Sequence, residues 1–211
     1  MSSYGIFENK NKTKKLVYYP CPKNANSSAK LFFAKHLNIA KNFIFLGDEV
    51  PRFLQKKEDY QNKKNLVSFL PTKQPFAKIN SDYKCCITRD PIKRFISTYK
   101  NRILYHKDQD FNNHSIDLIL EKLENNLFEN KHFLPQTYFL GNDLNYYNFY
   151  ADVNNINVFE KKVNDFFNNN IKFPKIQTGG SDINVVLNSE QITKIKIIYK
   201  ADFNFLKLNN K

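Results

Sequence analysis

The sequence has little cysteine, and it lacks long hydrophobic runs. Its three cysteines, Cys21, Cys85 and Cys86, are odd in number and two are adjacent, so they indicate reduced core thiols rather than a disulfide framework or a four-ligand zinc site. We therefore expect no bound metal. No segment carries roughly 18 or more uninterrupted apolar residues, and residues 1–15 lack the apolar core of a signal peptide. These absences predict a cytoplasmic protein without stable membrane insertion.

Arginine is also scarce, although the chain is strongly basic. The formal net charge is +13, and only four of the 33 basic residues are arginines: Arg52, Arg89, Arg94 and Arg102. Proteins that read nucleic acids favour clustered arginines, because the guanidinium group makes bidentate contacts. The lysines of this chain are scattered. The composition thus predicts a positive field that attracts anionic ligands, without a nucleic acid as partner.

The length and the order of the patterns predict one α/β domain. We expect a single domain over residues 1–211, with residues 1–14 as a flexible N-terminus. Short β-prone runs alternate with helical stripes, which predicts strands at 15–19, 43–46, 83–88 and 156–159 and helices at 27–41, 91–105, 115–130, 161–169 and 189–199. This alternation predicts a three-layer sandwich with a central parallel sheet, whose ligands bind at the carboxyl ends of the strands.

The loop between the first predicted strand and the first predicted helix is a candidate anion site. It reads Pro22-Lys23-Asn24-Ala25-Asn26-Ser27-Ser28. The N-terminus of a helix presents free backbone N–H groups to a phosphate or sulfate, to which Lys23 adds a charge and the serines add hydroxyl donors. The alternative is a plain helix cap preceded by a lysine that faces solvent. The loop lacks the glycines of a Walker A motif.

A second candidate segment again leads from a strand into a helix. It runs from Arg89 to Tyr99 and reads Arg-Asp-Pro-Ile-Lys-Arg-Phe-Ile-Ser-Thr-Tyr. Arg89 leaves the tip of the strand and Ser97 lies on the helix, so both can close on one phosphate. The alternative is a helix start with Asp90 complementing the helix dipole and with Arg94 and Tyr99 on the surface.

Together the two segments resemble those of the sulfotransferase superfamily, which pairs a P-K-x-x-x-S loop with an R-D-P-x-x-R-x-x-S-x-Y motif. Every fixed position of the second motif is present. The resemblance implies a P-loop-NTPase-like sulfotransferase fold and an enzyme whose donor is 3′-phosphoadenylyl sulfate (PAPS), with adenosine 3′,5′-bisphosphate (PAP) as product. It assigns the 5′-phosphosulfate to Lys23, Asn24, Ala25, Asn26, Ser27 and Ser28, and the 3′-phosphate to Arg89 and Ser97.

Three further segments resemble the carbohydrate sulfotransferase branch of that superfamily. Residues 130–136 look like its N-x-H-W-x-P-Q segment, residues 158–160 like a strand that ends in F-E, and residues 198–203 like a closing I-Y-x-x-D-F helix. The acceptor that this implies is a carbohydrate or a small molecule, sulfated on a hydroxyl or an amine. The chain differs in lacking a membrane anchor and in having Ala25 where the loop often has glycine, a mild change if the φ angle there is negative.

Sulfuryl transfer requires positioning and charge stabilisation, much like phosphoryl transfer. Lys23 is the residue expected to stabilise charge on the leaving nucleotide, and His132 is expected to be the general base. Asp48 and Glu49 are the competing bases. Two other functions stay open: a non-catalytic protein that binds nucleotides or nucleic acids, and a P-loop-like kinase. The sequence carries no signature for the oligomeric state.

Other conspicuous side chains have structural interpretations. His36 and His114 lack a partner pattern and are expected on the surface or on a helix face. Tyr146, Tyr147 and Tyr150 either line an acceptor groove or pack in the core.

Overall fold

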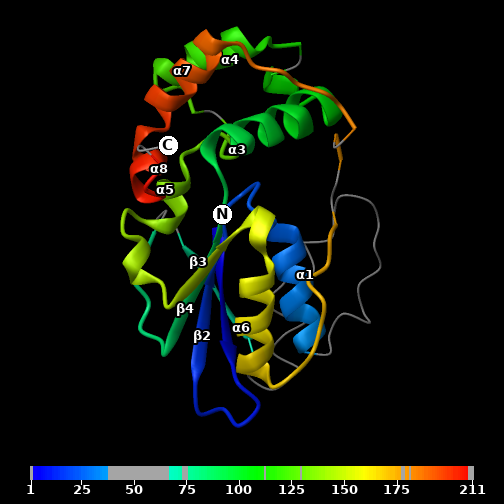
Figure 1. The fold of residues 1–211 in the computed structure, drawn as a ribbon, viewed down its shortest axis with the longest axis vertical. Helices are drawn as coiled ribbons and strands as arrows, with labels where there is room; N and C mark the ends of the chain where they lie inside the picture. The colour runs from blue at the N-terminus through cyan, green and yellow to red at the C-terminus, as the bar shows by residue number, and fades with distance from the viewer. Residues whose placement is uncertain are drawn as a thin grey trace.

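A five-stranded mixed sheet forms the centre of the molecule (Figure 1). The computed structural model of the protein describes residues 2–37, 67–72, 76–111, 113–128, 130–176, 179–180 and 182–208. The strands are β1 (Ser2–Glu8), β2 (Lys15–Tyr19), β3 (Val67–Thr72), β4 (Tyr83–Thr88) and β5 (Phe149–Asp152), and their order in the sheet is β3-β1-β2-β4-β5. The predicted strand at 43–46 and the carboxylates of Asp48 and Glu49 lie outside the described residues.

The predicted parallel sheet is present in β2, β4 and β5. β4 pairs in parallel with β2 and with β5, so the carboxyl ends of these strands meet at one edge. β1 pairs antiparallel with β2 and with β3, and the sequence patterns did not predict these antiparallel strands. The expectation that residues 1–14 form a flexible N-terminus is therefore corrected, because residues 2–8 belong to the sheet.

Helices cover both faces of the sheet, which confirms the α/β class. α1 (Asn26–His36) and α6 (Asn157–Phe167) pack on one face, whereas α5 (Gln136–Leu140) and α8 (Lys200–Phe205) pack on the other (Figure 1). Side chains of β2 point alternately to the two faces of the sheet and pack against both layers of helices. Leu16 and Tyr18 face α1, whereas Val17 and Tyr19 face α5. The three cysteines are buried free thiols, as predicted.

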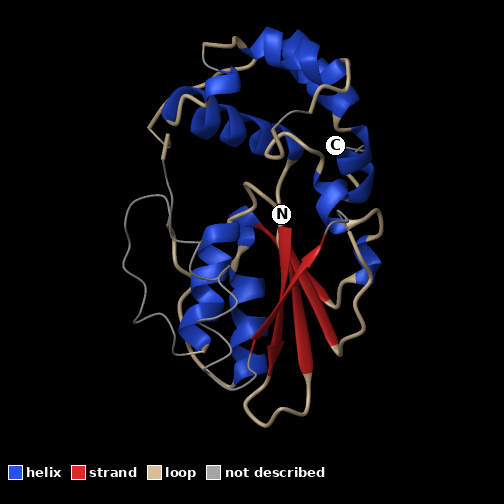
Figure 2. Cartoon of the chain, turned by 180° about the vertical axis from the view of Figure 1, so that it is seen from behind, coloured by secondary structure: helices blue, strands red, loops and turns tan. Residues whose placement is uncertain are grey.

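A group of helices lies beyond the carboxyl ends of the parallel strands (Figure 2). It consists of α3 (Pro91–Thr98), the π-helix Tyr99–Tyr105, α4 (Ile116–Glu124) and α7 (Ser189–Ile198). Ser115 caps α4, which ends earlier than predicted, and Asn188 caps α7 in a capping box with Gln191. Short 3₁₀ helices at Gln109–Phe111, Leu144–Tyr146 and Val153–Asn155 complete the described elements.

The predicted strand at 156–159 is wrong. Residues 157–159 form the first turn of α6, in which Phe159, Val163 and Phe167 recur at helical spacing and are buried. The strand that pairs with β4 on the side away from β2 is β5, and Tyr150 is exposed on it. Tyr147 is buried and donates to the carbonyl oxygen of Leu140 at 2.6 Å. Tyr147 is thus a core residue, one of the two interpretations that the sequence left open.

His36 is not a surface residue. It is 7% exposed and its ring contacts those of Phe32 and Phe167. Both ring nitrogens are buried and have no hydrogen-bond partner among the residues that the structure describes. Burial lowers the pKa of His36 to about 4, so the ring is neutral at physiological pH.

Candidate functional site

The two predicted anion-binding segments meet at one edge of the sheet. The first follows β2 and leads into α1, and the second follows β4 and leads into α3. Because β2 and β4 are parallel neighbours, two helix N-termini lie side by side there. Arg89 connects the segments directly, since its Nη1 donates to the carbonyl oxygen of Lys23 at 2.9 Å.

Asn24 fixes the first loop against the second. Its side chain is fully buried, and Nδ2 donates to the carbonyl oxygen of Ile87 at 2.9 Å and to Oε1 of Gln136 at 2.6 Å. Gln136 in turn accepts from the Arg89 N–H and donates to the Arg89 carbonyl oxygen. The Asn24 side chain therefore positions the loop, and its predicted contact with the donor stays a prediction.

The backbone of the loop is left-handed at two positions. Lys23 has a φ angle of 68° and Ala25 one of 54°. The condition under which alanine would be a mild change is therefore not met, because Ala25 adopts a conformation that favours glycine. Ala25 precedes α1 as its cap and supplies no side-chain hydrogen bond to the first turn.

The serines and Asn26 of the first turn differ in their surroundings. Ser28 is buried, and its Oγ accepts from the N–H of Ile176 at 3.2 Å. Asn26 Oδ1 accepts from the hydroxyl of Tyr18 at 3.5 Å, and Ser27 is half-buried. Their roles as donor ligands stay predictions.

Arg94 is a buried connector rather than a surface residue. It is 2% exposed and donates to three backbone carbonyl oxygens, those of Pro22 at 3.1 Å, Leu134 at 2.8 Å and His132 at 3.1 Å. Tyr99 is also buried and donates to the carbonyl oxygen of His114. The alternative that placed Arg94 and Tyr99 on the surface is wrong, because both hold backbone segments together.

Ser97 is half-buried on α3. Its hydroxyl makes no hydrogen bond within the part of the chain that the structure describes. No direct contact joins it to Arg89, so their shared phosphate stays a prediction.

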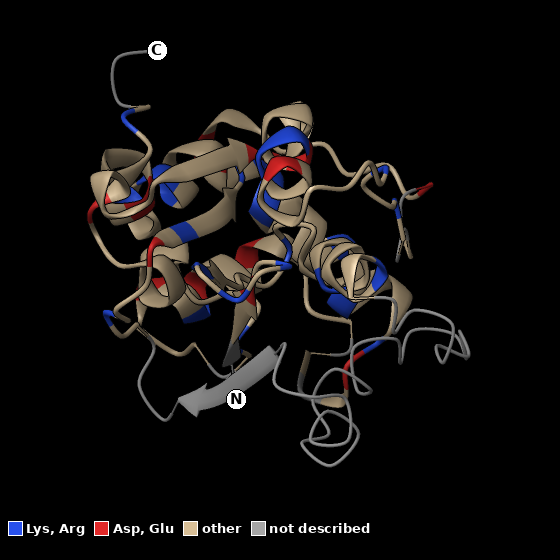
Figure 3. Cartoon of the chain, turned by 90° about the horizontal axis from the view of Figure 1, so that it is seen from below, with Lys and Arg blue, Asp and Glu red and all other residues tan. Residues whose placement is uncertain are grey.

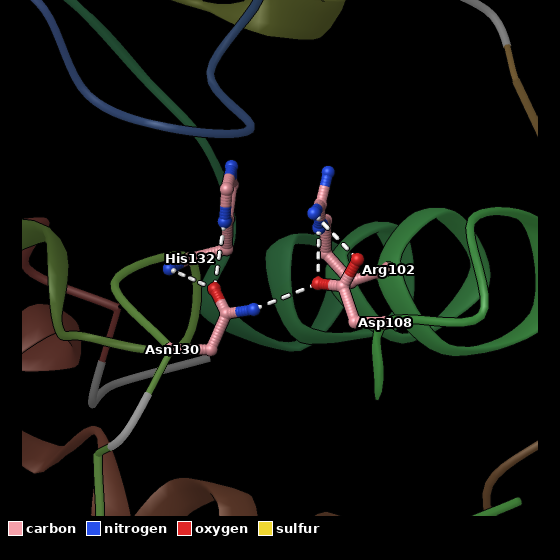
Figure 4. Close-up of polar contacts among 4 residues, drawn as sticks. All are labelled: Arg102, Asp108, Asn130 and His132. Carbon is pink, nitrogen blue, oxygen red and sulfur yellow. Dashed lines mark hydrogen bonds and ion pairs between the residues drawn. The ribbon is translucent and has the colours of Figure 1, made fainter. Parts of the chain in front are cut away.

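The segment 130–136 places His132 next to this edge. Asn130 Oδ1 accepts from the backbone N–H of His132 at 3.0 Å and lies 2.7 Å from its Nδ1. Asn130 Nδ2 donates to Oδ2 of Asp108 at 2.9 Å, and Arg102 donates to both oxygens of Asp108 (Figure 4). His132 therefore ends a chain of polar contacts that begins on the π-helix.

Positive charge dominates the surroundings of His132. Burial, and then Arg102, Lys23, Lys131 and Arg94 in that order, lower the pKa of His132 to about 3. Burial, followed by the charge of Lys131, lowers the pKa of Lys30 to about 8. The Lys23 charge reaches His132, so the loop and the histidine share one electrostatic environment.

The excess of cations fits a polyanionic ligand. Within the described residues, Lys30 makes no hydrogen bond or ion pair, and the nearby carboxylate of Asp108 is bound to Arg102 and Asn130. Burial also lowers the pKa of Arg89, and the negative charges of Asp152 and Asp90 partly offset this decrease. A bound anion would relieve the cost of half-burying these cations. Over the described chain as a whole, basic and acidic residues are interspersed, as Figure 3 shows.

Sequence reasoning missed the residues that hold segment 130–136 in place. The buried carboxylate of Asp202 accepts from the N–H groups of Gln136 and Thr137 at 2.8 and 2.9 Å, and Tyr199 donates to the carbonyl oxygen of Phe133 at 2.6 Å. Burial raises the pKa of Asp202, and the charge of Arg94 opposes that shift. A sequence signal for these contacts was present, because the residues involved belong to the two motif-like segments 130–136 and 198–203. The structure shows that these segments bond to each other.

The described residues contain no group of three or more His, Cys, Asp or Glu side chains that could hold a metal ion. Among the helices of those residues, none has the length and apolar character needed to cross a membrane.

Comparison with models of protein families gives a match that covers most of the chain. The model of the family described as the sulfotransferase family matches residues 9–209. No curated protein and no solved structure matches the chain significantly.

Proposed function

The chain belongs to the sulfotransferase family, and we propose that it transfers a sulfuryl group from PAPS to a hydroxyl or amine of an acceptor, for which a carbohydrate is the expected class. The observation that carries the proposal is the 2.9 Å hydrogen bond from Arg89 to the Lys23 carbonyl. It joins the two predicted phosphate-binding segments at the carboxyl ends of adjacent parallel strands. The family match supports neither the kinase nor the non-catalytic alternative.

The donor is proposed to lie across this edge. Lys23, the loop that ends at Ser28 and the first turn of α1 face the 5′-phosphosulfate, and Arg89 with Ser97 faces the 3′-phosphate. The half-buried cations Lys30 and Arg89 support this placement, because a bound polyanion would offset the cost of burying their charges. PAP is then the product that remains bound until release.

The reaction is proposed to be a direct displacement. The acceptor oxygen forms a bond to sulfur while the bond from sulfur to the phosphate oxygen breaks, and that electron pair stays on the nucleotide. Lys23 stabilises the charge that develops on the leaving phosphate. The acceptor proton passes to Nε2 of His132.

The low pKa of His132 keeps the ring neutral before proton transfer, and it disfavours the protonated ring that the transfer produces. At a pKa of about 3, the imidazole is neutral and available as a base at physiological pH. Binding of a polyanionic donor introduces negative charge beside the ring and raises its pKa, so the ring accepts a proton more readily in the complex. The base thus becomes effective when the donor is present.

The test combines a labelled donor with a panel of acceptors. Incubation with ³⁵S-labelled PAPS and glycans, lipids and small phenols should give a labelled product. His132→Ala should lower kcat by roughly 10²- to 10⁴-fold, leave PAP affinity nearly intact and remove the acidic limb of the pH–rate profile. The matched variant Glu49→Gln tests the competing base. Normal kcat and an unchanged acidic limb in His132→Ala, with loss of both in Glu49→Gln, would transfer the role to Glu49.

A further inference from the structure

Asn130 lies between a histidine and an aspartate, and each end of its amide has a defined partner. Oδ1 faces His132 and Nδ2 faces Asp108, as the dashed lines in Figure 4 show. Asp108 is itself held by Arg102, whose Nε lies 2.7 Å from Oδ2. The four side chains come from the π-helix, from the turn that follows it and from segment 130–136.

The orientation of the Asn130 amide is fixed by groups that cannot change roles. The backbone N–H of His132 can only donate, so the atom that it meets at 3.0 Å must be the amide oxygen. A carboxylate paired with a guanidinium can only accept, so the atom that Asp108 meets must be the amide nitrogen. Both partners select the same orientation.

This orientation determines the tautomer of the histidine. Because Asn130 Oδ1 can only accept, the Nδ1 atom that lies 2.7 Å from it must carry a hydrogen. In the neutral ring, Nε2 then holds the free electron pair. Nε2 lies on the edge of the ring that points away from Asn130 in Figure 4.

We propose that Arg102, Asp108 and Asn130 form a positioning relay that holds His132 as the Nδ1–H tautomer, so that Nε2 is the atom that receives the acceptor proton. The inference rests on the proposed function in so far as it gives His132 the role of base. The three relay residues are positioning residues, because they act through the ring.

The neutral amide in this relay has a specific electrostatic advantage. An aspartate in direct contact with the imidazole would favour the protonated ring, which cannot act as a base, and would repel a polyanionic donor. The Asp108 carboxylate holds the Asn130 amide, and the amide oxygen in turn holds the imidazole. No full negative charge then lies directly against the ring. Within the described part of the chain, the charges that act on His132 are cationic: Arg102 from the π-helix, Lys23 from the first loop, Lys131 from segment 130–136 and Arg94 from α3.

The experiment measures the tautomer directly and the activity separately. ¹⁵N NMR of histidine-labelled protein reports which ring nitrogen is protonated, and His132→Gln identifies the His132 signals among those of the four histidines. In the native protein at neutral pH, we expect a protonated Nδ1 and an unprotonated Nε2. Asn130→Ala should shift His132 toward the Nε2–H tautomer and lower kcat by about 10²-fold, with a much smaller change in PAP affinity.

Two further variants separate the relay from a structural effect. Asn130→Asp retains an oxygen that accepts from both His132 donors, so it should keep the native tautomer while raising the pKa of the ring and moving the acidic limb to higher pH. Asn125→Ala is the matched control, because the Asn125 side chain is exposed and its one hydrogen bond to a described residue goes to the carbonyl oxygen of Glu121. It should leave tautomer and kcat unchanged.

The outcomes distinguish the relay from the proposed function. A native tautomer in Asn130→Ala would overturn the relay, whatever the activity. A shifted tautomer with unchanged kcat would support the relay and overturn His132 as the base. A shifted tautomer with reduced kcat, in a protein whose other NMR signals are native, would support both.

Discussion

Arg94 donates a hydrogen bond to the carbonyl oxygen of His132 at 3.1 Å, so a helix that begins at the sheet edge holds the backbone of the proposed base. The same guanidinium donates to the carbonyl oxygens of Pro22 and Leu134. One buried cation therefore holds the loop that begins at Pro22 at a fixed distance from segment 130–136, which carries the histidine.

Arg94→Lys should be destabilising in spite of the retained charge. An ammonium group is compact and cannot reach three carbonyl oxygens in the planar geometry of a guanidinium, so at least one buried acceptor loses its partner. We expect a loss of about 3 kcal/mol in the free energy of unfolding, measured by urea denaturation. Lys93→Arg, the reverse exchange at the exposed neighbouring position, should change this free energy little. Similar stabilities for both variants would contradict the connector role.

Ala25→Gly should stabilise the protein, because the alanine is held at a φ angle of 54°. Relief of the left-handed conformation outweighs the greater flexibility of glycine in the unfolded chain, by about 0.5–1 kcal/mol. The same exchange within α1, Ala29→Gly, should instead destabilise by about 1 kcal/mol or more, since Ala29 is helical and buried. If both variants changed the free energy of unfolding in the same direction in urea denaturation, the backbone at Ala25 would not be strained.

Ser97→Ala is the cleaner test of the 3′-phosphate site. Arg89 also holds the Lys23 carbonyl, so Arg89→Ala should disturb the first loop and weaken binding of both PAP and adenosine 5′-phosphate. Ser97 has no such contact within the described residues. Its replacement by alanine should weaken binding of PAP by about 1 kcal/mol and leave binding of adenosine 5′-phosphate unchanged, as measured by calorimetry. An equal loss for both nucleotides would argue against Ser97 as a ligand of the 3′-phosphate.

Lys23→Ala should act mainly on the chemical step. Charge on the leaving phosphate grows only as the bond to sulfur breaks, so kcat should fall by roughly 10²-fold or more while the Kd for PAP changes less. Lys93→Ala removes a cation from the exposed side of α3 and should leave kcat unchanged. A Lys23 variant with native kcat and weakened PAP binding would make this lysine a binding residue only.

His36→Phe should remove part of the dependence of stability on acid pH. The pKa of His36 is about 4 in the folded protein against an ordinary value of 6.5, so between these values the unfolded chain takes up a proton that the folded chain does not. The stability that the neutral ring provides is complete above pH 6.5 and is lost as the pH falls toward 4. Phenylalanine cannot be protonated and places no polar ring atom at this buried position. Urea denaturation at several pH values should therefore give a flatter profile for this variant.

Strong local signals explain which parts of the fold and of the site the sequence could predict. β2 ends before a proline, and α3 begins with Pro91 behind Asp90, whose side chain accepts from the N–H of Lys93. β5 has only four residues and owes its conformation to pairing with β4. Residues 156–159 have the composition of a strand, but burial every fourth residue makes most of them helical.

The positions of Lys23, Arg89 and His132 near one edge followed from motif order, whereas their partners did not. The bidentate pair of Arg102 with Asp108 and the contacts of Asp202 with α5 join residues that no spacing rule connects. Ala25 shows the same limit within a single residue, because its side chain gave no indication of a left-handed backbone. Such contacts depend on tertiary packing.

The place of β1 in the sheet has a consequence for the order of folding. β1 and β2 form a hairpin closed by a short turn, in which Asn9 Oδ1 accepts from the N–H groups of Thr13 and Lys14. Such local pairing forms within microseconds, before the distant partners β3 and β4 can reach the hairpin. The β1–β2 hairpin therefore provides a template with two open edges, and the proposed reaction centre is completed only when β4 docks on the edge formed by β2.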